Sequence, residues 1–417
     1  MLKLKRAGKG DAVRIFRFMP RMLLILPAVL MAFGCGEKKP KQPVLKVSFS
    51  LTESEWDVFR KKVIPPFEEK HGCKIEAVQI DAADLPKLLL LGKRAGESKV
   101  DLFAQDNMEL AVLVKNGLVE DMSDLVRQYR NVVYPSLLEI GRFADAYYFI
   151  PFRTNVQIFY YNKAVFDRYG LSPPRSWDEW LKIAEFFYEK EKVGRILITG
   201  VGGNPTVTQM YEYIVAAGGD PFVFNDGGTK KTFLFFQRLW KAASPDSRKA
   251  KWDTSNDYFA RDSVYLMQNW TFGYKIITEQ YGKQDVEVYH GFPGPVREAH
   301  VIGGDVFGIP AGSQNKVLAL NFIEYMLSRD VQAVFVKDLA WPSVRSDAYN
   351  DASSGPAFKA IQDALHYGVF RKNVPYWSEY QKLFEEAFLR IVVNGESIDI
   401  LESLQTRMKH ITQKHPS

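Results

Sequence analysis

Residues 151–180 constrain the fold more than any other stretch, because they prescribe a strand, a rigid turn and two helix starts in a set order. Thr154–Tyr161 is rich in the β-branched and aromatic residues that suit a buried strand. Asn162 is a suitable N-cap for a short helix over Lys163–Tyr169, and Gly170 stands where a left-handed residue would end that helix.

A rigid connection and a second helix follow this unit. Pro173 and Pro174 are incompatible with a helix interior and stiffen the chain. Ser176 predicts the N-cap of the next helix, with Glu179 as its partner in a capping box and Trp177 as the first large apolar residue. Taken alone, this order also fits a generic strand–helix unit of an α/β domain.

Strands and helices alternate on both sides of the segment, and the first helix contains a Pro65-Pro66 pair that we expect to break or kink it. The predicted strands are Val44–Ser50, Lys74–Ile80, Val100–Phe103, Arg195–Thr199 and Val286–Tyr289. The predicted helices are Glu53–Lys70, Leu85–Lys93, Glu109–Asn116, Thr208–Ala217, Thr232–Ala243, Tyr258–Gln268 and Trp377–Asn394. This alternation is typical of an α/β fold with a mostly parallel, doubly wound sheet.

In order and spacing, these residues resemble the extracellular solute-binding proteins of carbohydrate ABC importers, the maltose-binding-protein-like family 1. The family pattern stands here as Pro151, Tyr161-Asn162-Lys163, Phe166, Gly170, Pro173-Pro174 and Ser176-Trp177-Asp178-Glu179. Further matches lie at Gly117–Asp121, at 303–335 and at 377–396. The resemblance therefore runs from about residue 44 to residue 405.

The resemblance implies a two-lobed periplasmic-binding-protein fold, in which each lobe is a doubly wound mixed sheet flanked by helices. Lobe 1 would combine residues 44–150 and 301–345, and lobe 2 would combine 151–300 and 346–417. The ligand would lie in the cleft between the lobes, with a hinge at Pro151. Closure about such a hinge is the motion that this kind of protein uses to capture a ligand.

The amino terminus predicts export. Residues 1–34 hold a basic stretch and then a twelve-residue apolar run, Met22–Phe33, which is too short to span a bilayer and indicates a signal peptide. Cys35 resembles the lipid-attachment cysteine of a bacterial lipobox, and residues 35–43 would form a flexible tether. Ala32 and Phe33 depart from the usual lipobox, so an ordinary cleaved signal with an incidental Cys35 stays open.

Charge and motif content exclude several classes of protein. Seven of the 55 basic residues and one of the 49 acidic residues lie in 1–34, which leaves 48 of each sign in the remainder. A formally neutral exported part is not expected to bind nucleic acid, which requires a basic patch. The six His and two Cys show no metal-ligand spacing, and no nucleotide-binding or GxSxG motif is present. We therefore expect neither a metal nor a cofactor.

The resemblance nominates five aromatic residues for the ligand cleft, because flat rings stack on the apolar faces of sugars. Trp270 and Phe272 match cleft aromatics of maltose-type proteins, and Trp56 follows the first strand. Trp341 and Trp377 lie near positions that can line the cleft. Packing in the core is the alternative role for Trp270, and packing on a helix face is the alternative role for Trp56.

Polar candidates follow from strand ends, since side chains at the carboxyl ends of α/β strands face the ligand crevice. Gln105, Asp106 and Asn107 follow the third strand in this way, and helix capping is their alternative role. The resemblance adds Asn155 and Gln157 on the hinge strand, for which ordinary burial is the alternative role. It also adds Gly303, Gly304 and Asp305 after a return crossing, where the backbone would meet the ligand.

The function that the resemblance implies is a monomeric, lipid-anchored substrate-binding protein of an ABC importer, in the periplasm or on the outer face of the cell membrane. It would capture a sugar or oligosaccharide, deliver it to the transmembrane permease and catalyse nothing. A polyamine, glycerophosphodiester or peptide ligand stays open, because Asp106, Asp305 and Arg153 suit charged solutes. A lipid-anchored glycoside hydrolase and a sensor subunit are further alternatives.

Overall fold

The computed structural model describes residues 42–80, 84–108, 110–348 and 356–415. The predicted signal peptide, Cys35 and nearly all of the predicted tether lie outside these residues. Within the described part, no helix combines the length and the apolar character needed to cross a membrane.

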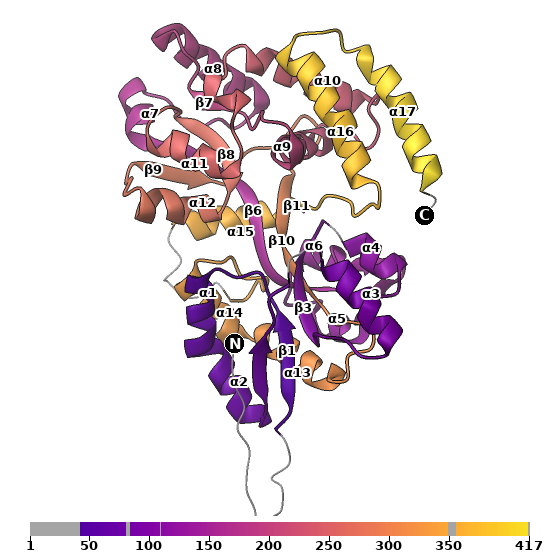
Figure 1. Ribbon diagram of the computed structural model, residues 1–417. Helices are drawn as coiled ribbons and strands as arrows, with labels where there is room; N and C mark the ends of the chain where they lie inside the picture. Colours follow the sequence, from indigo (N-terminus) through magenta and orange to yellow (C-terminus); the bar gives the residue numbers. More distant parts are fainter. Residues whose placement is uncertain (1–41, 81–83, 109, 349–355, 416–417) are drawn as a thin grey trace, which may run out of the picture. The chain divides into compact units, whose positions relative to one another are not determined.

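The amino-terminal half of the sheet is mixed (Figure 1). Strand β1 (Val44–Ser48) pairs in parallel with β2 (Lys74–Ala77) and with β3 (Leu102–Asp106). Strand β10 (His300–Gly308) lies antiparallel between β3 and β6 (Ile150–Asn162). A late segment of the chain therefore completes the sheet that the first strands begin.

The 13-residue strand β6 connects the two halves of the sheet. Up to Val156 it pairs with β10, and from Gln157 it pairs with β8 (Leu266–Trp270) and then with β9 (Val286–Tyr289). The short β7 (Ile196–Leu197) pairs in parallel with β8, and β11 (Gly368–Val369) with β10. This two-lobed arrangement of mixed sheets and helices confirms the predicted fold class.

Helices flank both halves, and in Figure 1 α1 and α2 lie on one side of β1 and β3 while α3 and α4 lie on the other. Helices α1–α6 are Glu53–Val58, Ile64–His71, Leu85–Ala95, Leu110–Lys115, Ser123–Tyr129 and Pro135–Glu139. Helices α7–α12 are Lys163–Tyr169, Trp177–Glu191, Gly203–Ala216, Gly227–Trp240, Trp252–Ala260 and Phe272–Lys275. Helices α13–α17 are Lys316–Met326, Arg329–Val334, Pro356–His366, Trp377–Ala387 and Ile400–Lys414. Strands β4 (Arg142–Phe143) and β5 (Ala146–Tyr147) form a separate hairpin.

The helices of the segment 151–180 begin and end as predicted, apart from one half of a capping box. Helix α7 begins where Asn162 Oδ1 accepts a hydrogen bond from the Val165 N–H at 3.0 Å, and it ends at Gly170, whose φ is +62°. The hydroxyl of Ser176 caps α8 by accepting from the Glu179 N–H. The Glu179 carboxylate accepts from the Arg175 N–H rather than from Ser176, so the expected capping box is only half formed.

Two predicted elements differ from the structure. The helix predicted over Glu53–Lys70 is divided into α1 and α2 by a π-helical turn over Phe59–Val63, and the Pro65-Pro66 pair stands at the start of α2. The wider turn relieves the clash between a proline ring and the carbonyl four residues earlier. The predicted helix Tyr258–Gln268 is helical only over its first three residues, since α11 ends at Ala260 and the chain from Leu266 forms β8 and pairs with β6.

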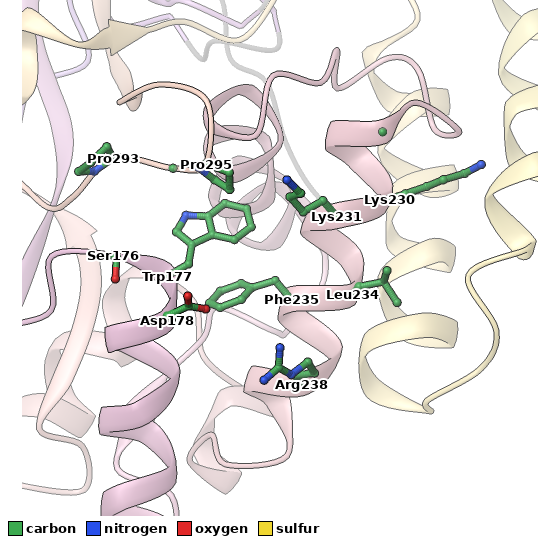
Figure 2. A pocket seen from close by; sticks show the side chains of 12 residues that line it. Ser176, Trp177, Asp178, Lys230, Lys231, Leu234, Phe235, Arg238, Pro293 and Pro295 are labelled. Carbon is green, nitrogen blue, oxygen red and sulfur yellow. The ribbon is translucent and has the colours of Figure 1, made fainter.

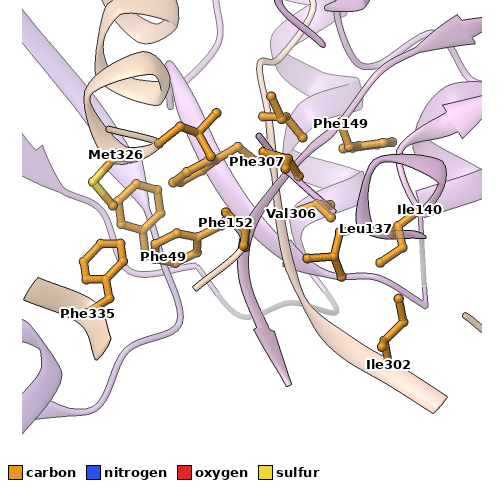
Figure 3. Packing of buried hydrophobic residues seen from close by; sticks show 14 of the residues in the cluster. Phe49, Leu137, Ile140, Phe149, Phe152, Ile302, Val306, Phe307, Met326 and Phe335 are labelled. Atoms are coloured by element: carbon orange, nitrogen blue, oxygen red, sulfur yellow. The ribbon is translucent and has the colours of Figure 1, made fainter. Parts of the chain in front are cut away.

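Aliphatic side chains and a group of phenylalanines form the core around β1, β6 and β10 (Figure 3). Phe152 of β6 packs on Phe307 of β10 with ring centroids 4.5 Å apart, and Phe49 lies 5.5 Å from Phe152. A second core joins α8, α9, α10 and α16 around the fully buried Trp180. Burial of this apolar surface holds β6 and β10 in fixed register, which positions the polar residues between them.

Candidate functional site

Three adjacent strands bring the polar candidates together. Asp305 of β10 pairs with Asp106 of β3 on one side and with Arg153 of β6 on the other. The register shifts at a bulge directly after Asp305, which is a common device for turning a side chain toward a site. These strands border a cavity of about 300 Å³, the cleft cavity, lined by Glu55, Asp106, Arg153, Thr154, Asn155, Thr271, Phe272, Gly304, Asp305, Ala340, Trp341 and Pro342.

Arg153 organises the charged groups of the cleft cavity. Its Nε donates to Asp305 Oδ2 at 2.7 Å, and its Nη1 donates to Glu55 Oε1 at 3.4 Å. The guanidinium lies over the ring of Trp341, 4.9 Å from the ring centroid. The indole Nε1 of Trp341 donates to the same Glu55 oxygen at 3.2 Å. The ion pairs therefore hold an aromatic face in one orientation beside two carboxylates.

Glu55 was missed by the sequence reasoning, although a local signal marks it. Its Oε2 accepts from the Thr52 N–H at 2.7 Å in a capping box that starts α1, while its Oε1 serves the cleft cavity. A Thr-x-x-Glu pattern directly after the first strand predicts this cap. The ion pair that the same carboxylate makes in the cleft cavity depends on Arg153, which lies 98 residues further along the chain.

Glycine is required at the back of the cleft cavity. Gly304 has a φ of +122°, and an added Cβ would overlap the carbonyl oxygen of Arg153. At Gly303 the added atom would lie 2.6 Å from Asn155 Oδ1 and 3.0 Å from the ring of Trp270. Both positions therefore allow a close approach of backbone to side chains that any other residue would obstruct.

Asn155 lines this cavity, but its acceptor oxygen is buried against Gly303. That Oδ1 has no hydrogen-bond partner in the described part of the chain. A buried acceptor without a partner costs about 1–3 kcal/mol.

Six of the predicted site residues line the cleft cavity. They are Asp106, Asn155, Phe272, Gly304, Asp305 and Trp341. Gly303 lies directly behind them, against Asn155. Arg153, which was considered only for charged solutes, also lines the cavity. The lining residues that were not predicted are Glu55, Thr154, Thr271, Ala340 and Pro342.

The other predicted residues lie elsewhere. Trp270 is 4% exposed and packs edge-to-face on Trp252 at 5.7 Å, so its ring supports Gly303 from behind rather than lining the cavity. Trp56 borders a separate cavity beside the ends of β1 and β2. Trp377 donates through its indole N–H to Asn204 Oδ1 at 3.1 Å, among the aromatic rings of the second core.

Three predicted polar residues, Gln105, Asn107 and Gln157, are almost fully buried and do not line the cleft cavity. The guanidinium of Arg371 is also buried and donates to Thr208 Oγ1 at 2.8 Å. Burial lowers the pKa of the Arg371 guanidinium, while the negative charge of Asp106 acts in the opposite direction. Asp106 thus faces the cavity with a buried cation close to it.

Two further cavities differ from the cleft cavity in their lining. The apolar cavity, about 420 Å³, shares Glu55, Thr271, Phe272, Ala340 and Trp341 with the cleft cavity. A third cavity of about 600 Å³ lies between the start of α8 and one face of α10, where Trp177 and Phe235 point toward each other (Figure 2). None of the sequence-predicted site residues lines it. Among the described residues, no group of three or more His, Cys, Asp or Glu side chains is placed to hold a metal.

A family model described as "Bacterial extracellular solute-binding protein" matches residues 62–360, which include β3, β6, β8 and β10. The chain belongs to this family. As an extracellular solute-binding protein, it carries the mixed sheet flanked by helices that was described above.

Relatives of this solute-binding protein have related descriptions. An ABC transporter extracellular-binding protein of Pyrococcus horikoshii is 24% identical over 304 residues, which cover 67% of this chain and 66% of that protein. A multiple sugar-binding protein of Streptococcus mutans is 26% identical over 172 residues, 40% of each chain. The chain therefore spans less than two thirds of the length of these curated relatives.

Solved structures show the same fold. A cyclo/maltodextrin-binding protein complexed with maltotetraose superposes with a TM-score of 0.77 at 18% identity, over 90% of this chain and 99% of that one. At this low identity the superposition establishes only the fold of the solute-binding protein. The ligand must be inferred from the residues of this chain.

Proposed function

We propose that this protein binds a sugar or oligosaccharide in the cleft cavity and delivers it to the permease of an ABC importer. The observation that carries the proposal is that aromatic side chains and fixed polar groups line the same cavity. Phe272 is 39% exposed, and Trp341 is held by Glu55 and Arg153 in the same cavity. Sugars present apolar C–H faces and hydroxyls, so they need both kinds of surface at once.

The descriptions of related proteins support this proposal. One relative is named for binding multiple sugars, and one structural neighbour holds maltotetraose. Capture would proceed by hinge closure between a lobe of residues 44–150 and 301–345 and a lobe of 151–300 and 346–417. The protein would act as an exported monomer, anchored by lipid at Cys35, and without catalysis of its own.

Isothermal titration of the purified exported part against a panel of mono- and oligosaccharides tests the proposal. We expect micromolar or tighter binding of at least one sugar, and a loss of at least tenfold in affinity for Phe272→Ala. Leu234→Ala is the matched control, because Leu234 is similarly exposed, at 46%, but lines the third cavity. Absence of binding to every sugar, together with tight binding of another solute class, would overturn the proposal.

A cationic solute such as a polyamine is the second candidate, and one specific observation favours it. Glu55, Asp106 and Asp305 line the cleft cavity, whereas Arg153 is the cation among its lining residues. An excess of carboxylates suits a polyamine, whose binding weakens as salt screens the charges. Titration with spermidine at low and high salt separates this candidate from a neutral sugar, whose affinity is expected to be nearly independent of salt.

A further inference from the structure

The apolar cavity adjoins the cleft cavity but differs from it in chemistry. Ten of its sixteen lining residues are apolar or aromatic, compared with four of twelve in the cleft cavity. Val58 of α1, Ile276 and Leu339 line it and are only partly buried. Aliphatic side chains that are partly exposed in a concave site lack packing partners on one side, and a bound apolar group would supply them.

The charged residues of the apolar cavity are already paired. Asp338 accepts from Lys62 at 2.7 Å, and Lys275 lies 3.8 Å from Glu279. Glu55 is shared with the cleft cavity, where it is engaged by Arg153 and Trp341. Beyond the Phe272 ring, six of the other lining residues are aliphatic and three are aromatic, while the uncharged polar residues are Thr52, Thr271 and Gln280.

A second sugar ring is poorly suited to such a surface. Valine, isoleucine and leucine side chains cannot pair with hydroxyls, and each hydroxyl left without a partner on burial costs about 1–3 kcal/mol. An alkyl or aryl group has no hydroxyl to leave without a partner, and its transfer from water into an apolar cavity is favourable. A cavity of about 150 Å³ with a similar lining is large enough for benzene, and the apolar cavity measures about 420 Å³.

We infer that the ligand is a glycoside that carries an apolar substituent, with its sugar in the cleft cavity and the substituent in the apolar cavity. This inference rests on the proposed function for the sugar part. Continuity between the two sites comes from Phe272 and Trp341, which line both. Ala340, also shared, has a left-handed φ of +52°, so the chain turns sharply where the two cavities meet.

The test compares methyl and hexyl β-glycosides of the same sugars, below the concentrations at which the hexyl compounds form micelles. We expect hexyl glycosides to bind at least about tenfold more tightly, because each buried methylene contributes up to about fourfold. Ile276→Gln and Leu339→Gln should each remove most of this gain and leave methyl glycoside affinity unchanged. Two variants guard against a folding defect in one, and Leu234→Gln in the third cavity is the matched control.

An uncharged apolar fluorophore, N-phenyl-1-naphthylamine, separates this inference from the proposed function. We expect one bound fluorophore whose signal falls in Ile276→Gln and survives in Leu234→Gln. Equal affinity of methyl and hexyl glycosides, or a fluorophore signal lost only in Leu234→Gln, overturns the inference and leaves sugar binding intact. Binding of the fluorophore at Ile276 without binding of any glycoside supports the apolar site and overturns the sugar proposal.

Discussion

The substitution Gly304→Ala tests whether the backbone at the back of the cleft cavity is built for close approach. Gly304 has a φ of +122°, a region that is open essentially to glycine alone. The new Cβ would overlap the carbonyl oxygen of Arg153 and lie 2.8 Å from the Thr154 Cα. Both neighbours are backbone, so relief requires β6 and β10 to separate.

The expected loss of stability in Gly304→Ala follows from a comparison with another glycine. Gly72 also has a positive φ, +61°, but an added Cβ there would have nothing within 4 Å. Gly72→Ala therefore reports the left-handed backbone cost alone, about 1–2 kcal/mol. Gly304→Ala adds a steric overlap of the kind that typically costs a further 1–3 kcal/mol, for a total of about 2–5 kcal/mol.

Urea unfolding of both variants, followed by circular dichroism, measures the stability difference, and titration with the best-binding solute measures affinity. We expect Gly304→Ala to lose more stability than Gly72→Ala and at least tenfold in affinity, because the strand pair that holds Arg153 against Asp305 is displaced. Gly72→Ala should bind normally. Equal loss of stability in the two variants with unchanged affinity in both would refute the reasoning.

Three further outcomes follow from other contacts. Burial disfavours a charged His300, but the carboxylates of Glu212 and Glu298 raise its pKa to about 9. The charged His300 side chain therefore stabilises the folded protein by about 3 kcal/mol below pH 6.5, the usual pKa of an unfolded histidine, and this contribution is lost as the pH rises through about 9. Urea unfolding measured across this pH range should show the decline in the wild type and not in His300→Gln. Asn162→Ala removes the α7 cap and should lower the free energy of unfolding by about 1–2 kcal/mol with affinity unchanged, whereas a change in affinity alone would contradict a capping role. Arg153→Gln should reduce affinity at least tenfold in the same titration, and wild-type affinity would show that the ion pair does not orient the cavity.

Local signals in the sequence account for much of the fold. The strand β6, the Asn162 cap, the Gly170 terminus and the Ser176 cap depend on neighbours within a few residues, so each was predictable from the chain nearby. The predicted helix over 258–268 failed because its apolar run has no periodicity that separates a buried strand from a buried helix. Pairing of β8 with β6 decided the outcome, and that pairing joins residues about a hundred positions apart.

Some residues of the candidate site were also predictable from the sequence, and others were not. Asp106, Asp305 and Trp341 were nominated from strand ends and from family resemblance, and they line one cavity. Trp270 was nominated on the same grounds, yet its ring is covered by Trp252 and the backbone of Gly303. The direction in which a side chain points at the end of a strand depends on what packs behind it, and a position in the sequence does not specify that.

The sequence by itself determined where the chain turns, caps and alternates, and thereby the α/β class and the family, because these depend on short-range sterics and hydrogen bonds. Tertiary structure alone decided which polar groups meet. Arg153 reaches Glu55 and Asp305 only because β10 returns between β3 and β6, and only there does an aromatic face become fixed beside two carboxylates. The physical reason is that contacts between distant segments are set by packing of the whole core, whereas caps and turns are set by a few adjacent residues.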